Sequence, residues 1–177
     1  MSEKLKKEIF EWIKVFALAI VFAFIITQFI KPTLVRGDSM YSTLEEGDYL
    51  IINRMSYKFK EPEHGDIIVF ESDLKQDDGS SKDLVKRVIG VGGDKVKIEN
   101  NKVYVNDEEL NEPYIHNEIT EGDIDTVVPD GAVFVLGDNR EISLDSRYDS
   151  VGFISKSDIL GKVFVRLYPF NKIGLLD

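Results

Sequence analysis

The order of apolar and polar positions divides the chain into one long apolar run and a series of short alternating segments. The run, residues 15–30, contains sixteen residues and no charged side chain. As a helix these residues rise about 24 Å, and Trp12 and Ile13 extend this length to about 28 Å, close to the ~30 Å hydrocarbon core of a bilayer. We therefore predict a transmembrane helix over residues 12–30, which overlaps a short N-terminal segment, residues 1–14.

A cleaved signal peptide and a buried helix of a soluble protein are the two alternatives to a membrane anchor. A cleaved signal peptide needs small residues three and one positions before the cut. Residues 27–30 (Thr-Gln-Phe-Ile) do not supply them. The sequence does not exclude the second alternative, a buried helix of a soluble protein. We favour a retained membrane anchor that ends at Lys31 and Pro32.

The charges that flank the run bear on its orientation in the membrane. Lysines precede it within residues 1–14, and Lys31 and Arg36 follow it. A long acidic domain carries little weight in the positive-inside rule, so the rest of the chain does not decide the orientation. We expect a single-pass protein of the cell membrane, with its N-terminus in the cytoplasm and residues 35–177 forming an extracytoplasmic domain.

From residue 44 onward, turn residues alternate with short β-branched runs, which is typical of β-strands. The predicted strands are residues 49–53, 67–70, 84–91, 96–99, 102–105, 132–136 and 161–167. Asn100 and Asn101 tolerate the positive φ that a tight hairpin turn needs. The predicted fold class is therefore mainly β, an antiparallel β-sheet domain that follows one N-terminal helix.

Three segments between these strands have other patterns. Residues 71–83 are polar and are predicted to form a mobile surface loop. Residues 111–128 are acidic and are expected to be irregular and exposed, while residues 155–160 can hold a short helical turn. We place a small inserted hairpin and loop region at about residues 96–128.

Composition excludes several classes of function. The formal net charge of -10 and a pI near 4.8 argue against a nucleic-acid partner, which requires a basic face. The chain has no Cys, so thiol catalysis and disulfides are excluded. His64 and His116 are far apart and have no ligand-like spacing around them, so we expect neither a metal site nor a cofactor.

The first stretch with potential chemistry begins five residues after the apolar run, at residue 35. Ser39 lies there in a tight polar turn with Gly37 and Asp38 before it and the apolar Met40 after it. Such a turn can present a hydroxyl close to a membrane. A lone Ser in a Gly-Asp-Ser turn is usually only a turn residue, so the assignment depends on two further stretches.

The second stretch, residues 84–91, is a predicted strand that contains Lys86. Alternation places Lys86 on the face opposite Val85, Arg87 and Ile89. The lysine is then either an edge residue that reaches solvent, the commoner case for a strand considered alone, or a buried amine. Burial lowers the pKa of an amine, and a neutral amine beside a Ser hydroxyl is a workable general base.

The third stretch, residues 137–147, reads Gly-Asp-Asn-Arg-Glu-Ile-Ser-Leu-Asp-Ser-Arg. It is either a polar loop after a strand with local pairing between acidic and basic side chains, or a set of hydroxyls and charges that orients a base.

Together, the three stretches resemble the type I signal peptidases. The resemblance covers the N-terminal anchor, the Ser motif, the Gly-Asp strand starts, the Lys-Arg-Val-Ile-Gly strand and the Gly-Asp-Asn-Arg…Ser-x-Asp-Ser-Arg loop. It implies that Ser39 attacks the scissile carbonyl and that Lys86 is the general base. A lysine base, where the eukaryotic and archaeal branch has His, indicates the bacterial type.

The resemblance also implies supporting roles. It assigns orientation of the lysine to Ser143 and structural support of the site to Asp145 and Arg147. Arg87 and Asp138 are expected to form a second ion pair behind the site.

The sequence departs from the family pattern at two positions. Ser42 stands where the family usually has Pro, three residues after the nucleophile. Gly37 stands where Gram-negative members often carry a Ser whose hydroxyl completes the oxyanion hole, and the chain is similar to the Gram-positive members in this respect. The oxyanion is then expected to bind the backbone N–H of Ser39 and a second donor that the sequence leaves open.

The resemblance implies a membrane-anchored serine endopeptidase that removes N-terminal signal peptides from exported preproteins. It further implies substrates with small residues before the cut, and we expect Met40 to line a shallow substrate pocket. Membrane lipid is the other expected partner, and the sequence leaves the oligomeric state open.

Two alternatives belong to other classes of protein. A self-cleaving Ser/Lys regulator related to the SOS-response repressors needs a DNA-binding helix pair and a basic face, which this sequence lacks. A membrane-tethered binding module that has lost its activity has no reason to retain Ser39, Lys86, Ser143 and Asp145 together.

Overall fold

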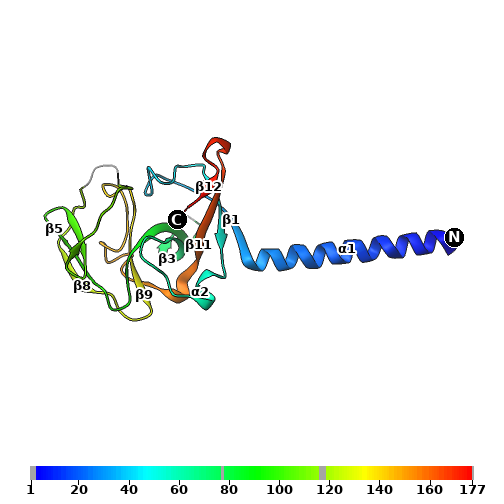
Figure 1. The fold of residues 1–177 in the computed structure, drawn as a ribbon, viewed down its shortest axis with the longest axis horizontal. Helices are drawn as coiled ribbons and strands as arrows, with labels where there is room; N and C mark the ends of the chain where they lie inside the picture. The colour runs from blue at the N-terminus through cyan, green and yellow to red at the C-terminus, as the bar shows by residue number, and fades with distance from the viewer. Residues whose placement is uncertain (1–2, 77, 116–118, 177) are drawn as a thin grey trace.

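A long N-terminal helix and a compact β domain make up the chain, as the computed structural model shows for residues 3–76, 78–115 and 119–176. Helix α1 (Glu3–Phe29) leaves the domain as a single rod, with the N-terminus at its far end (Figure 1). None of its residues is buried, and its most apolar 18-residue window has a mean hydropathy of 2.4. The predicted apolar helix is therefore present, and its length and composition fit a membrane anchor rather than a helix buried in this domain.

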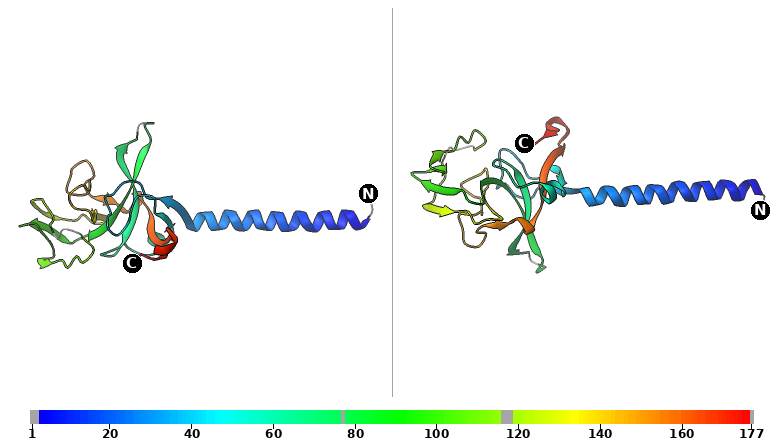
Figure 2. Two further views of the ribbon diagram at one scale, coloured as in Figure 1. Left: turned by 90° about the horizontal axis from the view of Figure 1, so that it is seen from above. Right: turned by 60° about the horizontal axis from the view of Figure 1, so that its bottom comes forward.

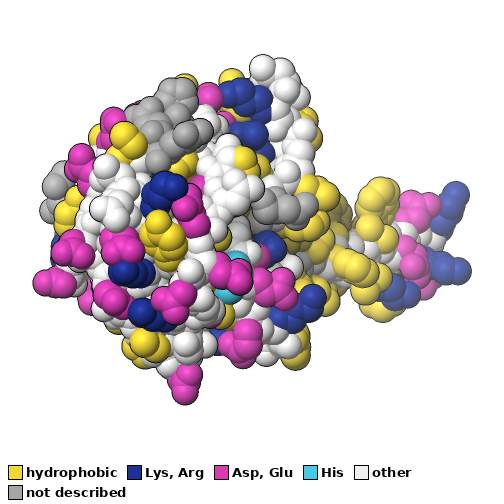
Figure 3. Space-filling model, turned by 60° about the vertical axis from the view of Figure 1, so that its left-hand side comes forward, with side chains coloured by type: hydrophobic (Ala, Val, Ile, Leu, Met, Phe, Trp, Pro, Cys, Tyr) yellow, Lys and Arg dark blue, Asp and Glu magenta, His cyan; other side chains and the backbone are white. Residues whose placement is uncertain are grey.

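The helix begins nearer to the N-terminus than the apolar run alone indicates. Its first turns carry ion pairs at i,i+3 spacing, Lys6 with Glu3 and Lys14 with Glu11, each at 2.9 Å. The space-filling view shows that charged side chains gather at the far end of α1, while apolar side chains cover the part nearer the domain (Figure 3). This distribution agrees with a helix whose first turns lie outside the apolar layer.

The helix ends at Phe29, just before the expected Ile30, because the chain continues directly into a strand. Strand β1 (Ile30–Leu34) was not predicted from the sequence, since it contains Pro32. Within the part of the chain that the structure describes, β1 pairs with β2 (Tyr49–Asn53) alone. Proline is tolerated on such an edge strand because one side needs no N–H donor.

The main sheet is antiparallel and contains eight strands. Its order is β1-β2-β11-β3-β4-β9-β10, and β12 pairs with β11. The remaining strands are β3 (Ile67–Lys75), β4 (Ser81–Val91), β9 (Ala132–Leu136), β10 (Ile154–Ser155), β11 (Ile159–Tyr168) and β12 (Gly174–Leu175). Short helices interrupt the strands at α2 (Ser56–Phe59), η1 (Lys156–Asp158) and η2 (Phe170–Lys172). The predicted mainly-β antiparallel fold is confirmed, and η1 is the helical turn expected within residues 155–160.

A smaller sheet lies at the end of the domain opposite α1 (Figures 1 and 2). Its order is β7-β6-β5-β8, from β5 (Lys95–Glu99), β6 (Lys102–Val105), β7 (Glu108–Glu109) and β8 (Ile124–Val127). Asn100 and Asn101 have φ of 49° and 64°, so the predicted hairpin turn is confirmed. Acidic and basic side chains are interspersed on the face of this end that Figure 3 shows.

Two segments that were expected to be loops contain strands in the structure. Residues 71–83 were expected to be a loop, but β3 and β4 continue through most of them as a hairpin with Ser72 opposite Lys82. Part of the expected irregular segment 111–128 is strand β8, in which Ile124 pairs with Ile98. In both cases main-chain pairing with a neighbouring strand outweighs a polar composition, which local propensity alone cannot reveal.

Two parts of the apolar core position the functional residues. One cluster lies beneath residues 35–44 and contains Val35, Met40, Leu44, Leu50, Ile52, Ile67, Val69 and Val163. A second joins the two sheets and contains Ile89, Val96, Ile98, Val103, Val128, Phe134 and Leu136. β4 contributes to the inter-sheet cluster and lies between β3 and β9, so its middle is interior to the sheet.

Candidate active site

Ser39 lies in the connection between β1 and β2, which is held as a compact turn. Val35 N–H donates to the Asp48 carbonyl at 2.9 Å, and Leu44 N–H donates to the Met40 carbonyl at 2.8 Å. Gly37 has φ of +78°, in the left-handed region that favours glycine. The apolar side chains of the turn enter the core, whereas Ser39 remains partly exposed.

Lys86 is a buried amine rather than an edge residue. Only 1% of the residue is exposed, because its side chain points into the domain towards the Ser39 turn, although this part of β4 pairs only with β3 among the described strands. Its Nζ donates to Ser39 Oγ at 2.7 Å and to the Val85 carbonyl at 3.0 Å. Of the two alternatives for this lysine, the structure therefore selects the one that suits a general base.

The buried position changes the acidity of this amine. Desolvation by burial lowers the pKa of Lys86 to about 8, although the carboxylates of Asp145 and Asp138 act in the opposite direction. A substantial fraction of the amine is therefore neutral at mildly alkaline pH. A neutral amine at 2.7 Å from a hydroxyl can accept its proton.

The loop after β9 fixes the position of the Ser39 turn. Asn139 N–H donates to the Ser39 carbonyl at 3.1 Å, and Asn139 Nδ2 donates to the Asp38 carbonyl at the same distance. Gly137 lies against this contact, since a methyl group there would overlap both the Ser39 carbonyl and Ser143 Oγ. The close approach of the two loops explains why glycine stands at position 137.

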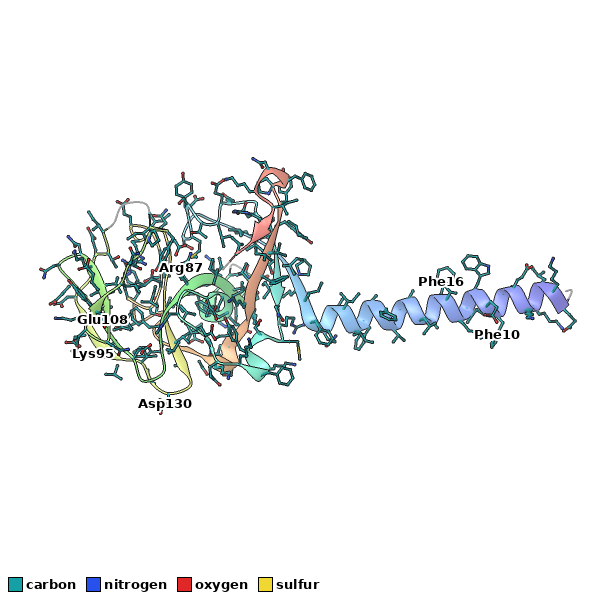
Figure 4. The ribbon with its side chains drawn as sticks, in the orientation of Figure 1. Phe10, Phe16, Arg87, Lys95, Glu108 and Asp130 are labelled. Carbon is teal, nitrogen blue, oxygen red and sulfur yellow. The ribbon has the colours of Figure 1, made fainter. Side chains whose placement is uncertain are left out.

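Behind the dyad, a buried ion pair and its hydrogen bonds join four segments of the chain. Arg87 donates to the Asp138 carboxylate through Nε at 2.9 Å and Nη2 at 2.7 Å. Thr43 Oγ1 donates to the same carboxylate at 2.5 Å, and Arg87 Nη1 donates to the Gly65 carbonyl at 3.0 Å. The expected ion pair is present, and through Thr43 it also ties the Ser39 turn to β4. Figure 4 shows Arg87 within the domain, far from Phe10 and Phe16 on α1.

A second ion pair shapes the loop itself. Asp145 is fully buried and accepts from Arg147 Nε at 2.8 Å and from Gly137 N–H at 3.0 Å. Arg147 also donates to the Arg140 carbonyl at 2.7 Å. These bonds close the loop upon itself and hold the segment that contacts Ser39.

A groove of about 530 Å³ runs past Ser39 and Lys86. One wall comes from β1 and the residues that follow it, and the other from the first half of β4, with Ile142 and Leu144 also at its border. Among the described strands, β1 pairs with β2 alone and residues 81–86 of β4 pair with β3 alone, so each wall ends in a strand edge without a described partner. Lys31 Nζ and Asp83 Oδ2 connect the walls at 3.1 Å.

Comparisons with known proteins identify the family of this chain. The family model for signal peptidase, peptidase S26, matches residues 9–168. The chain is 40% identical to signal peptidase IB of Staphylococcus aureus (strain COL) over 95% of this chain and 94% of that protein. It is 35% identical to signal peptidase I of Bacillus licheniformis, with coverage of 99% and 97%. The chain belongs to the signal peptidase family. A crystal structure of a signal peptidase I from Enterococcus faecalis V583 is 32% identical, covers 58% of this chain and 97% of that chain, and has a TM-score of 0.48.

Ser143, which was expected to orient Lys86, lies at the site but does not bond to it. Its Oγ is buried and has no hydrogen-bond partner within the described part of the chain. The hydroxyl lies beside Gly137, at the contact between the loop and the Ser39 turn. The structure therefore places Ser143 at the site without the bond to Lys86 that its expected orienting role requires, and that role stays a prediction.

Met40 differs from its expected place in the substrate pocket. The side chain is 1% exposed and packs with Val35 and Leu44 in the core, and it is not among the residues that line the groove. The physical reason is that the apolar side chains of the turn, Met40 included, pack into the core beneath it, while Ser39 stays partly exposed. His116, the other residue discussed for metal binding, lies outside the described residues.

Three further residues of the site were not identified from the sequence. Thr43 bonds to Asp138 of the ion pair, and Asn139 bonds to the Ser39 turn. Arg140 is buried and donates to the Glu112 carboxylate and to the Gly137 carbonyl, which links the region between β7 and β8 to the loop. The Asn139 and Arg140 contacts lie in the Gly-Asp-Asn-Arg motif, so the motif itself was the available signal.

Proposed function

We propose that this chain is a membrane-anchored serine endopeptidase that cleaves signal peptides from exported preproteins, with Ser39 as nucleophile and Lys86 as general base. The observation that carries the assignment is the 2.7 Å contact between the buried Lys86 amine and Ser39 Oγ. Similarity to signal peptidases over nearly the whole chain supports the substrate class.

The reaction begins from the neutral amine. The Ser39 hydroxyl transfers its proton to Lys86 Nζ while Oγ attacks the scissile carbonyl, and a tetrahedral intermediate forms. The resulting ammonium returns the proton to the leaving amine as the C–N bond breaks, which leaves an ester on Ser39. A water molecule then attacks the ester and gives a proton to Lys86. The ammonium passes this proton to Ser39 Oγ as the acyl C–O bond breaks, which releases the carboxylic product and regenerates the hydroxyl and the neutral amine.

The backbone N–H of Ser39 is the proposed donor to the oxyanion. It makes no hydrogen bond to any residue within the described ranges, so it is open to a substrate oxygen. Preorganised donors of this kind stabilise the charge that develops in the transition state. The contacts of Asn139 with the carbonyls of Ser39 and Asp38 hold this donor in place.

The groove fits an extended substrate. A peptide strand between β1 and β4 can bond to their unpaired edges, which is the mode of recognition called strand addition. Apolar residues on the walls, among them Leu34, Val85 and Leu144, suit the side chains that precede the cut. We retain the proposal that small residues occupy the positions beside Ser39.

We further propose that the N-terminus is cytoplasmic and that the β domain lies outside the membrane. β1 begins at Ile30, immediately after α1, and Lys31 already lines the groove. The groove therefore starts where the helix ends, and a signal peptide in the bilayer has only a short distance to travel. Digestion of sealed vesicles with an added protease tests this orientation, because only an outward domain is accessible.

The activity is tested by incubating the full-length chain in detergent with a secretory precursor. Mass mapping of both products is expected to show a single cut after a small residue that follows the apolar part of the signal peptide. The matched control is a precursor in which that small residue is replaced by a large one, such as Phe. Cleavage of mature regions at many sites, or no cleavage, would contradict the proposal.

A further inference from the structure

Helix α2 and the residues around it lie beside the end of α1. Arg54 follows β2, and its N–H donates to the Phe29 carbonyl at 2.9 Å, while its Nη1 lies 3.5 Å from the Thr27 carbonyl. Arg54 is therefore level with the last turn of the apolar helix. Figures 1 and 2 show α2 on the side of the domain from which α1 leaves. With α1 in a bilayer, residues 54–60 lie at its surface.

This segment is basic, although the chain as a whole has ten more acidic than basic residues. Arg54, Lys58 and Lys60 are exposed, and none of the three forms an ion pair with another residue in the described ranges. Positive charges without carboxylate partners in the described ranges match the negative charge of anionic headgroups at this place.

The acidic groups near this segment mostly have partners of their own. Asp66 pairs with Lys162 and accepts from the Tyr57 hydroxyl, and Glu61 pairs with Lys156. Glu63 borders the same region and forms no ion pair with a described residue. Its single charge leaves the three cations in excess.

A large apolar side chain lies between the two lysines. Phe59 is 84% exposed, and Phe164 on β11 is 53% exposed. Both border a hollow of about 410 Å³, whose lining also includes Met55, Lys60 and Leu176. An exposed aromatic ring flanked by lysines is unfavourable in water but suits the boundary between headgroups and acyl chains.

We propose that residues 54–60 form a contact site for anionic phospholipids, in which Phe59 enters the boundary region and Lys58 and Lys60 bind headgroup phosphates. The site rests on the proposed anchoring of α1 but not on peptide cleavage. A second point of attachment beside α1 limits the tilt of the domain and so holds the groove at a fixed height above the bilayer. Each lysine removed is expected to weaken the contact about fivefold.

The test uses full-length protein with a single Trp at the site, made by Phe59→Trp and Trp12→Phe, in the inactive Ser39→Ala background. The protein is placed in vesicles with brominated acyl chains, either of phosphatidylcholine alone or with phosphatidylglycerol added. We expect Trp fluorescence at position 59 to be quenched strongly only with the anionic lipid. Lys58→Gln with Lys60→Gln is expected to remove that difference.

Three controls make the result decisive. The native Trp12, in a chain with Phe59 intact, reports whether α1 itself has entered the bilayer. A single Trp at Val127→Trp, on the 60% exposed β8 position of the smaller sheet, should stay unquenched. Lys95→Gln with Lys102→Gln changes the net charge equally on that distant sheet and should leave the signal at position 59 unchanged.

Two results would overturn the proposal alone. Quenched Trp12 with an unquenched Trp at position 59 means that α2 faces water. Equal quenching in both lipids, unaffected by the lysine substitutions, means that Phe59 enters without recognition of anionic lipid. An unquenched Trp12 instead overturns the proposed anchoring of α1, and this inference with it.

Discussion

The Lys86 amine donates a 2.7 Å hydrogen bond to Ser39 Oγ from a position where only 1% of the lysine is exposed. The two residues are 47 positions apart in the sequence, and they meet because β4 passes beneath the turn that carries Ser39. The buried position places the Lys86 amine beside the hydroxyl, and the loss of solvent there lowers the affinity of the amine for a proton. The reactivity and the fold therefore have a common cause.

The rate of cleavage should follow the deprotonation of Lys86. Burial lowers the pKa of Lys86 to about 8, and only the neutral amine can accept the Ser39 proton. We expect kcat/KM to rise about tenfold per pH unit below pH 8 and to level off above it. A pH–rate profile on a short peptide measures this rise, and a rate that is constant from pH 6 to 10 contradicts a lysine base.

The same burial should make Lys86 costly for stability. Its folded-state pKa of about 8 lies below the ordinary 10.5, so the unfolded chain binds the proton more tightly. The cost is complete below pH 8, falls as pH rises from 8 to 10.5, and vanishes above that range. Lys86→Met removes the charge at similar volume, and we expect it to raise the free energy of unfolding by up to about 3 kcal/mol at pH 7.

Denaturant unfolding at a series of pH values tests this difference between Lys86→Met and the native chain. The difference in the free energy of unfolding between the two proteins should become smaller as the pH approaches 10.5. Lys102→Met, at an exposed position on the smaller sheet, is the matched control and should not be stabilised in this way. A gap that widens with pH would show that the sign of the pKa shift is wrong.

Gly137→Ala should impair catalysis through geometry alone. The added methyl group overlaps the Ser39 carbonyl and Ser143 Oγ, so the turn has to move. Because displacements of about 1 Å can cost ~10²-fold in rate, we expect a fall in kcat of that order. The same substitution at Gly174, where a methyl group meets nothing within 4 Å, should leave kcat unchanged. Equal kcat values for the two variants would show that Gly137 does not determine the position of Ser39.

Asp138→Ala should destabilise the domain strongly. It leaves the buried Arg87 guanidinium without its carboxylate, a loss that typically costs about 3–5 kcal/mol. Glu109→Gln breaks an exposed ion pair with Lys102 and should change the free energy of unfolding by less than about 1 kcal/mol. Urea unfolding of both variants provides the comparison, and similar small losses would mean that Arg87 finds another partner.

The sequence predicted those parts of the structure that depend on local pattern. The apolar helix, strand β2 and the Asn100–Asn101 turn are encoded by composition and by residues next to each other. β1 and the extended β3–β4 hairpin are not, because their strand character comes from pairing with distant partners. Local propensity is outweighed wherever such pairing satisfies the main chain.

In the site, too, the local sequence predicts some features and contacts with distant residues decide the others. The residue types at Ser39 and Lys86 suggested the chemistry, but alternation alone left Lys86 as either an edge or a buried residue. Only the contact of the Lys86 side chain with the Ser39 turn decides between them. Met40 was misplaced because a single apolar residue in a turn can face a pocket or the core, and the packing beneath the turn decides which.

The most direct test of the account is the rate of precursor processing by Ser39→Ala, by Lys86→Met and by the double variant, each in full-length protein shown to be folded by circular dichroism. Because the two residues act as one nucleophile–base unit, we expect each single variant to lose nearly all activity and the double variant to lose no more. Lys102→Met, at an exposed position on the smaller sheet away from the groove, serves again as the control and should process the precursor at the native rate. Processing by either single variant at more than a small fraction of the native rate would contradict the Ser39–Lys86 dyad.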